Sequence, residues 1–157
     1  MTDSGTQILQ RILGFTTVFL GFCSYLIWRP TNLIMFRWID SAGLQDVYVA
    51  PRFVIQQIVR DPPSWVVYSA PNGLWVAGSS VLLMAAAPSS IAVHRMGLFA
   101  IPVCALGLEI GQVSTWIPGT FDGLDLLAIA SGSAVVWMYF FYCVSHHSTD
   151  RRHTLNG

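Results

Sequence analysis

Charged side chains are scarce in this chain, which contains no lysine and a single glutamate. Only 10% of its 157 residues are charged, and eight arginines are balanced by eight acidic residues. A nucleic-acid-binding surface would show a basic excess, so no nucleic-acid partner is expected. Because 54% of the residues are hydrophobic, the composition predicts a single-domain integral membrane protein rather than a soluble domain.

Cysteine is also rare, and the familiar catalytic motifs are missing. Cys23, Cys104 and Cys143 lie far apart in apolar runs, which is typical of small buried side chains and not of a disulfide framework or metal cluster. The sequence has no nucleophile elbow, phosphate loop, dinucleotide fingerprint or zinc-protease pattern. These absences remove the common soluble enzyme classes from consideration.

Long apolar runs dominate what is present. An α-helix needs about 20 apolar residues to cross a bilayer. The runs predict an all-α integral membrane protein with four transmembrane helices, at about 8–28, 64–87, 96–116 and 124–144. A loop over 29–63 then connects the first two spans. Pro88-Ser89-Ser90 followed by His94-Arg95 makes a short turn after the second span, and a polar tail covers 145–157.

The 29–63 loop is expected to be amphipathic and outside the membrane. Residues 32–39 form one amphipathic piece, and residues 52–60 form another. In the second piece, Phe53, Ile55, Ile58 and Val59 could lie on the bilayer while Arg52, Gln56, Gln57 and Arg60 face water or head groups. A short helix packed on other loops fits the same periodicity equally well. The loop is also where a protein partner could dock.

The arginines give a tie when orientation is judged by counting them. With the amino terminus in the cytoplasm, four lie inside and four outside: Arg11, Arg95, Arg151 and Arg152 against Arg29, Arg37, Arg52 and Arg60. The inner connections are the shorter ones, and the 117–123 turn carries no positive charge. We therefore expect both termini to be cytoplasmic.

One acidic cluster is out of place in an apolar chain. Glu109 lies inside a predicted span, with Gln112 three residues later on the same helix face. Asp122 and Asp125 begin the next span, and the intervening turn returns the chain to a similar depth. An ionisable group in hydrocarbon is costly, which makes it a functional hypothesis by default. Acid–base chemistry, or a divalent cation held by the carboxylates, suits such a set.

Each of these residues also has a structural explanation. Asp122 could cap the fourth span, where an acid favours the helix amino terminus, and Asp125 could do so less readily. Glu109 could be a hydrogen-bonded structural group. Small residues in the last two spans are expected to permit close helix contacts: Gly107, Gly111, Gly132 and Ser133.

A second polar interruption falls in the span over 64–87. Pro71-Asn72-Gly73-Leu74-Trp75 combines helix-breaking and polar residues at membrane depth. Such breaks persist where protein or a cavity satisfies the freed backbone groups. Asn72 is therefore either a cavity-facing group or a partner in an interhelical hydrogen bond.

These motifs together resemble the VanZ-like membrane proteins. The resemblance rests on Glu109-x-x-Gln112, the Pro118-Gly119 turn, and Phe121-Asp122-x-x-Asp125-Leu126-Leu127 leading to Gly132. The 71–75 segment is similar to the Pro-Asp-x-Leu-Trp opening of a span in one branch of that family, with Asn72 in place of the acid. The resemblance extends over most of residues 8–145.

The resemblance implies a bacterial inner-membrane protein related to glycopeptide resistance. It implies action on a lipid or lipid-linked cell-envelope intermediate, by cleavage or exchange of a phosphate-linked head group. The carried-over site has Glu109 as the acid–base residue, Asp122 and Asp125 positioning the substrate or a cation, and Gln112 donating a hydrogen bond. Asn72 and Trp75 are expected on the substrate. The rival interpretation is a non-catalytic scaffold, a lipid-binding or lipid-moving module, or a subunit of a complex.

Overall fold

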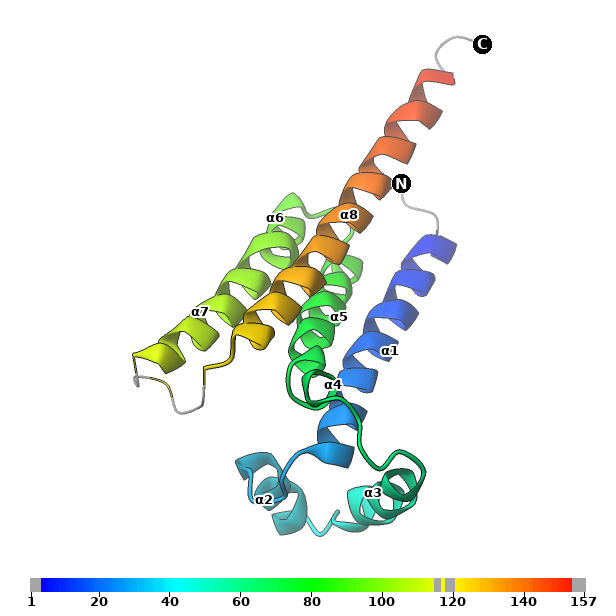
Figure 1. Cartoon of the computed structure of the whole chain (residues 1–157). Helices are drawn as coiled ribbons and strands as arrows, with labels where there is room; N and C mark the ends of the chain where they lie inside the picture. The colour runs from blue at the N-terminus through cyan, green and yellow to red at the C-terminus, as the bar shows by residue number, and fades with distance from the viewer. Residues whose placement is uncertain (1–3, 115–116, 118–120, 154–157) are drawn as a thin grey trace.

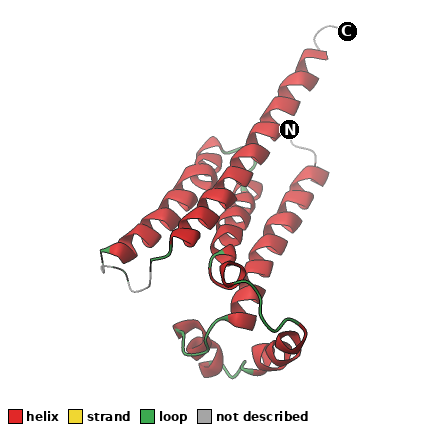
Figure 2. Cartoon of the chain, viewed as in Figure 1, coloured by secondary structure: helices red, strands yellow, loops and turns green. Residues whose placement is uncertain are grey.

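The computed structural model describes residues 4–114, 117 and 121–153, with the backbone alone over 142–153. Every regular element in that part of the chain is helical, and no strand is found there (Figure 2). The helices are α1 (Ser4–Trp28), α2 (Ile34–Ser41), α3 (Asp46–Ile58), α4 (Ser64–Tyr68), α5 (Ala70–Ala86), α6 (Ile91–Arg95), the π-helical turn η1 (Met96–Ala100), α7 (Ile101–Val113) and α8 (Gly123–His153). The all-α prediction is therefore confirmed.

Three helical stretches are long and apolar enough to cross a membrane. They are Ser4–Trp28, Ile91–Val113 and Gly123–Phe141. The predicted span over 64–87 is not among them, because the helix breaks at Ser69 and leaves α5 with 17 residues. Pro71 explains the break, since it has no N–H to donate to the Val67 carbonyl four residues earlier and its ring would clash with that carbonyl, so the helix restarts just before it.

Two predicted boundaries also differ from the structure. The third span begins at Ile91 and not near 96, so His94 and Arg95 lie inside α6 and not in a turn. Ser90 allows this earlier start because its hydroxyl accepts a hydrogen bond from the Val93 N–H, which caps the helix. At the other end, α8 continues into the predicted polar tail as far as His153.

The long helices form an up-and-down bundle. α5 lies between α1 and α8, and the helix formed by α6, η1 and α7 packs against both α5 and α8 (Figure 1). The start of α1 and the end of α8 lie at one end of the bundle, and α2 and α3 lie at the opposite end. The end of α7 and the start of α8 are also at this second end.

Glycines set the closest helix contacts. A Cβ on Gly73 of α5 would lie 2.5 Å from the Ala128 carbonyl oxygen of α8, and one on Gly132 would lie 2.4 Å from the Gly73 carbonyl oxygen. On the other face of α5, a Cβ on Gly78 would lie 2.8 Å from the Gly14 carbonyl oxygen of α1. Only glycine lets these backbones approach so closely.

A proline inside the third long helix is compensated from α8. Pro102 has no N–H to donate to the Leu98 carbonyl four residues earlier. The Trp137 indole N–H of α8 donates to that carbonyl oxygen instead, at 3.1 Å. The π-helical turn η1 directly precedes this point. A sequence feature that weakens one helix thus becomes a link between two.

α2 and α3 cap the carboxyl end of α1. Arg52 of α3 donates to the carbonyl oxygens of Leu26 and Arg29 at 3.2 and 2.8 Å, and Gln56 donates to the Ile27 oxygen at 2.6 Å. These carbonyls have no partner within α1, and a cation there also suits the helix dipole. Arg52 and Gln56 therefore face α1, and the prediction that they face water or head groups is wrong.

An aromatic cluster holds the same unit together. Phe36 of α2 is fully buried, with its ring 6.2 Å from that of Tyr25 and 4.9 Å from that of Tyr48. Burying a phenylalanine side chain contributes about 1.5–3 kcal/mol. The outer surface is different, because Trp38, Phe53 and Ile58 are mostly exposed. Gln57 and Arg60 are exposed as well.

Candidate functional site

Glu109 is a buried carboxylate near the end of α7, with 5% of its surface exposed. Its Oε1 accepts the backbone N–H of Asp122 at 3.0 Å, and its Oε2 accepts the Gln112 side-chain amide at 3.1 Å. The first bond links residues 13 apart and closes the turn between α7 and α8. The predicted contact of Glu109 with Gln112 is present, and both carboxylate oxygens are used by the protein itself.

Asp122 acts as the cap of α8. Its Oδ1 accepts the Leu124 N–H at 2.9 Å, and its carbonyl oxygen accepts the Asp125 N–H at 3.0 Å. An aspartate in this position satisfies helix N–H groups that have no partner within the helix. The structure therefore supports the capping explanation for this side chain. Asp122 meets Glu109 through its backbone, so the two carboxylates are not drawn into one site by that bond.

Asp125 is the acid whose hydrogen bonding is incomplete. It is 8% exposed, and its Oδ1 has no hydrogen-bond partner among the described residues. A buried acceptor without a partner costs roughly 1–3 kcal/mol, and a charged one costs more. Such a group calls for an explanation, and a functional role is a common one.

A second orphaned oxygen lies at the same level of the bundle. Ser69, at the break between α4 and α5, is 2% exposed, and its hydroxyl has no partner in the described part of the chain. α5 and α8 run in the same direction and touch where Gly73 meets Ala128 and Gly132. About one turn before that contact, α5 begins next to Ser69 and α8 carries Asp125. Sequence reasoning missed Ser69, although Pro71 marked the break.

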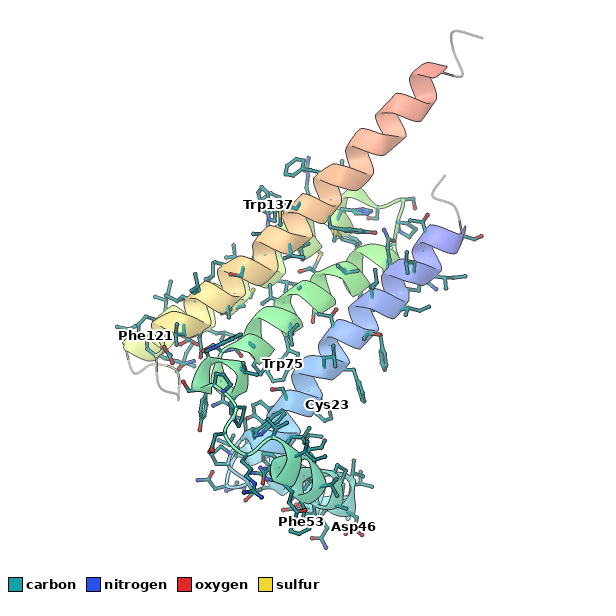
Figure 3. The ribbon with its side chains drawn as sticks, turned by 45° about the vertical axis from the view of Figure 1, so that its right-hand side comes forward. Cys23, Asp46, Phe53, Trp75, Phe121 and Trp137 are labelled. Carbon is teal, nitrogen blue, oxygen red and sulfur yellow. The ribbon has the colours of Figure 1, made fainter. Side chains whose placement is uncertain are left out.

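The two residues predicted to contact the substrate, Asn72 and Trp75, lie in different surroundings from the acids. Trp75 packs on α1, with its ring 5.5 Å from that of Tyr25 and its indole against Gly21. In Figure 3, Trp75 lies between α5 and α1, away from Phe121 at the start of α8. Asn72 is partly buried, and its backbone N–H donates to the Ser69 carbonyl at 3.0 Å. In the described part of the chain, neither side chain forms a hydrogen bond or ring contact with Glu109 or Asp125, and Trp75 is part of the α1 packing.

The acids do not assemble a metal site. Among the described residues, no group of three or more histidine, cysteine, aspartate or glutamate side chains could hold a metal ion. The Pro118-Gly119 motif and the side chains of the predicted polar tail, which include His146 and His147, lie outside what the structure describes. The donors near Glu109 are amide N–H groups, which suit a carboxylate and not a cation.

A long apolar groove runs along the bundle from the end at which Ser69 lies. It has a volume of about 750 Å³, with α5 as its floor and α1 and α8 as its walls. Ser69, Trp65 and Leu124 line one end, and Leu13 and Tyr139 line the other. At the end lined by Leu13 and Tyr139, the Gln10 amide of α1 donates to the Tyr139 hydroxyl of α8 at 2.9 Å. The groove therefore extends from the orphaned hydroxyl to a bridge between its two walls.

Comparison with known proteins gives no match to a family model, to a curated protein or to a solved structure.

Proposed function

We propose that this protein is a VanZ-like membrane enzyme that acts on a lipid or lipid-linked cell-envelope intermediate in a bacterial inner membrane. The observation that carries the proposal is the buried, incompletely bonded carboxylate of Asp125, beside a turn fixed by Glu109. The acidic motif that resembles the family includes both residues. Three long apolar helices support a membrane location for the substrate as well.

Asp125 is assigned the contact with the substrate. Its free Oδ1 can accept the proton of a water or alcohol while the oxygen of that water or alcohol attacks the phosphorus of a head-group phosphate. The protonated Asp125 then gives this proton to the departing alkoxide as the P–O bond breaks, so the head group leaves as an alcohol and Asp125 returns to its ionised form. Glu109 positions the loop that precedes Asp125, because it holds the Asp122 backbone. Gln112 orients the Glu109 carboxylate through its amide.

We further propose that α4 and α5 together make a fourth crossing. α5 has 17 residues, which span about 26 Å, and α4 extends it toward the membrane surface. The start of α1 and the end of α8 lie at one end of the bundle, which requires an even number of crossings. Both termini are placed in the cytoplasm, so Glu109 and Asp125 lie toward the outer face.

The enzymatic proposal is tested with Asp125→Asn, which keeps the size of the side chain and removes its charge. Envelope lipids and lipid-linked precursors are compared by mass spectrometry in cells producing equal amounts of wild type or variant. We expect the wild type to make a lipid species appear or disappear. In cells that produce Asp125→Asn, we expect that species not to change. Asp122→Asn is the matched control, because asparagine caps helices as well as aspartate and should behave like wild type.

The result that would overturn this proposal is a lipid profile for Asp125→Asn identical to that of the wild type, with the wild type itself changing the profile. The changed species would then have been made without the carboxylate, and Asp125 would not be catalytic.

A non-catalytic lipid-binding module is the second candidate. It is favoured by the complete use of both Glu109 oxygens in holding the turn and by the apolar groove. The exposed apolar surface of α2 and α3 gives such a module a contact with a protein partner or a bilayer. Under this function no single carboxylate is indispensable, and substitutions at Trp38 or Phe53 weaken function more than Asp125→Asn does.

A further inference from the structure

We propose that the groove between α1, α5 and α8 holds one acyl chain of a bilayer glycerophospholipid, with the Ser69 hydroxyl donating to its ester carbonyl. This inference deepens the proposed function, on which it rests for the membrane setting and for the class of lipid. It assigns the apolar part of the substrate, whereas the acids address the head group.

The lining of the groove matches a hydrocarbon chain. Its walls and floor are mainly aliphatic and small side chains, including Leu13, Leu74, Val81, Leu127 and Val135. The volume of about 750 Å³ lies within the range of roughly 300–1,000 Å³ that is typical of ligand sites. From Leu124 to Tyr139, α8 rises about 22 Å, which is more than half of the roughly 30 Å hydrocarbon core of a bilayer.

One polar group that lines the groove, the Ser69 hydroxyl, is placed as an ester would require. Ser69 is 2% exposed, its hydroxyl has no partner among the described residues, and it lines the groove. A hydroxyl is a good donor to a carbonyl oxygen, and pairing it removes the cost of its burial. Trp65 lines the same end and is 55% exposed, as is typical of an aromatic side chain at the membrane interface.

The ends of the groove give the acyl chain a direction. The Gln10–Tyr139 hydrogen bond joins the two walls at the end near the termini, where the methyl end of the chain would stop. The opposite end, at Ser69 and Leu124, is at the level of Asp125. An acyl chain that enters with its ester at Ser69 therefore brings its phosphate toward Asp125.

The test uses the full-length protein in phosphatidylcholine vesicles. A small fraction of the phosphatidylcholine carries a photoreactive diazirine in one acyl chain, and labelled peptides are mapped by mass spectrometry after illumination. We expect the label to concentrate on residues that line the groove, rather than on the other exposed positions of the same helices.

Ser131→Phe fills the groove from α8, where Ser131 is exposed and lines it. We expect this variant to reduce groove labelling about tenfold, equivalent to roughly 1.4 kcal/mol. Ala130→Phe adds the same ring at a neighbouring exposed position outside the lining and should label like the wild type. Ser69→Ala removes a single donor, and we expect a loss of about two- to tenfold.

Even labelling around α1 and α8, or unchanged labelling in Ser131→Phe, would overturn the inference. Cross-links between α1 and α8 of two copies, with no lipid in the groove, would also overturn it by showing a helix of a second copy there. The two readouts separate the two proposals, because labelling reports on the acyl-chain site and the lipid profile reports on the chemistry. Groove labelling with an unchanged lipid profile would contradict the enzymatic function and leave the acyl-chain site standing.

Discussion

At the residue scale, Glu109 connects the candidate chemistry to the fold. The single glutamate of the chain uses one oxygen to hold the Asp122 backbone and the other to receive the Gln112 amide. This makes it a positioning group for the residues that follow. The hypothesis from the sequence, that Glu109 is itself the acid–base residue, stays a prediction that substitution can decide.

We expect Glu109→Ala to lower the free energy of unfolding by about 1–3 kcal/mol, because a buried backbone N–H loses its acceptor. Glu109→Gln should cost much less, since a glutamine side-chain oxygen can still accept from Asp122, and Gln112 can turn its own amide oxygen toward the new amide. Denaturation of the two variants in the same detergent, followed by circular dichroism, measures the difference. Equal losses in both variants would mean that the charge, and not the hydrogen bond, stabilises the turn.

The two variants also separate positioning from catalysis in the cell-based lipid assay. A positioning residue keeps its function in Glu109→Gln, whereas an acid–base residue loses it at normal protein abundance. Loss of the lipid change in Glu109→Gln, with stability near that of wild type, would return the catalytic role to Glu109.

Some of the site could be predicted from the sequence, because it depends on local spacing. Glu109 and Gln112 are three apart on one helix, and Asp122 stands directly before a helix, so their contacts follow from backbone geometry. Ser69 and Asp125 are different, because their unmatched oxygens result from how α5 and α8 pack. No spacing rule relates two residues 56 positions apart. That Ser69 and Asp125 lie at the same height in the bundle could therefore be seen only in the structure.

At the element scale, glycines decide how closely α5 and α8 pack. We expect Gly132→Ala to destabilise the protein by about 1–3 kcal/mol, because its methyl group would overlap the Gly73 carbonyl, which cannot move aside. Gly107→Ala is the matched control on α7, where a Cβ meets nothing within 4 Å. Alanine lowers the conformational entropy of the unfolded chain, so Gly107→Ala should stabilise the protein by about 0.5–1 kcal/mol. Thermal unfolding in one detergent compares them.

If Gly132→Ala were as stable as Gly107→Ala, the close contact of α5 and α8 would be wrong. The sequence expectation that small residues permit close helix contacts is met at Gly132. Gly107, by contrast, is exposed, and nothing packs on it. Composition identifies a small residue but not the neighbour that it faces.

The α2–α3 unit has its own titration. Tyr48 donates a hydrogen bond to Asp40 at 2.8 Å. This bond, together with burial and the Asp40 charge, raises the pKa of Tyr48 above its ordinary value near 10, while Arg52 acts in the opposite direction. A raised pKa means that the folded unit favours the protonated phenol. Its contribution to stability is complete below the ordinary pKa and is lost as the pH rises through the higher folded value.

We expect a difference titration of tyrosinate absorbance, wild type minus Tyr48→Phe, to show a midpoint above pH 10. Asp40→Asn should move that midpoint down, because the amide is a weaker acceptor and carries no charge. Near-ultraviolet circular dichroism followed over the same range should weaken as Tyr48 ionises. A midpoint at or below 10 in the wild type would show that the Tyr48–Asp40 bond does not form.

Element types were easier to predict than element ends. Run length alone predicts helical structure over all four expected spans, because a single apolar segment satisfies its own backbone in hydrocarbon as a helix, and three of the four are long and apolar enough to cross a membrane. The ends depend on single interactions, such as the Ser90 cap that begins α6 five residues earlier than expected. In the same way, Arg52 and Gln56 were predicted to face water because periodicity cannot show that the end of α1 lies above them.

At the scale of the whole molecule, the open question is how many times the chain crosses the bilayer. Single cysteines in a background without Cys23, Cys104 and Cys143 can answer it. With a crossing through α5, Ser4→Cys and Ser89→Cys should react with a membrane-impermeant maleimide from one side, and Ala42→Cys from the other. All three positions are exposed.

If α5 did not cross, Ser89→Cys would react from the same side as Ala42→Cys, and Ser4→Cys would stand alone. The same assay on intact cells assigns the cytoplasmic side, because a reagent that stays outside reaches only the outer positions. We expect Ala42→Cys to be the one that reacts in intact cells.

The capping of α1 by α3 has a consequence for how the protein is made. The last carbonyls of the first helix receive their donors from Arg52 and Gln56, which lie 23 to 29 residues further along the chain. Ribosomes add about 5–20 residues per second, so the end of this helix waits roughly 1–6 s for its partners. During that interval water and lipid head groups must donate hydrogen bonds to those carbonyl oxygens. The end of the first helix therefore acquires its final hydrogen bonds only after the chain has folded back on it.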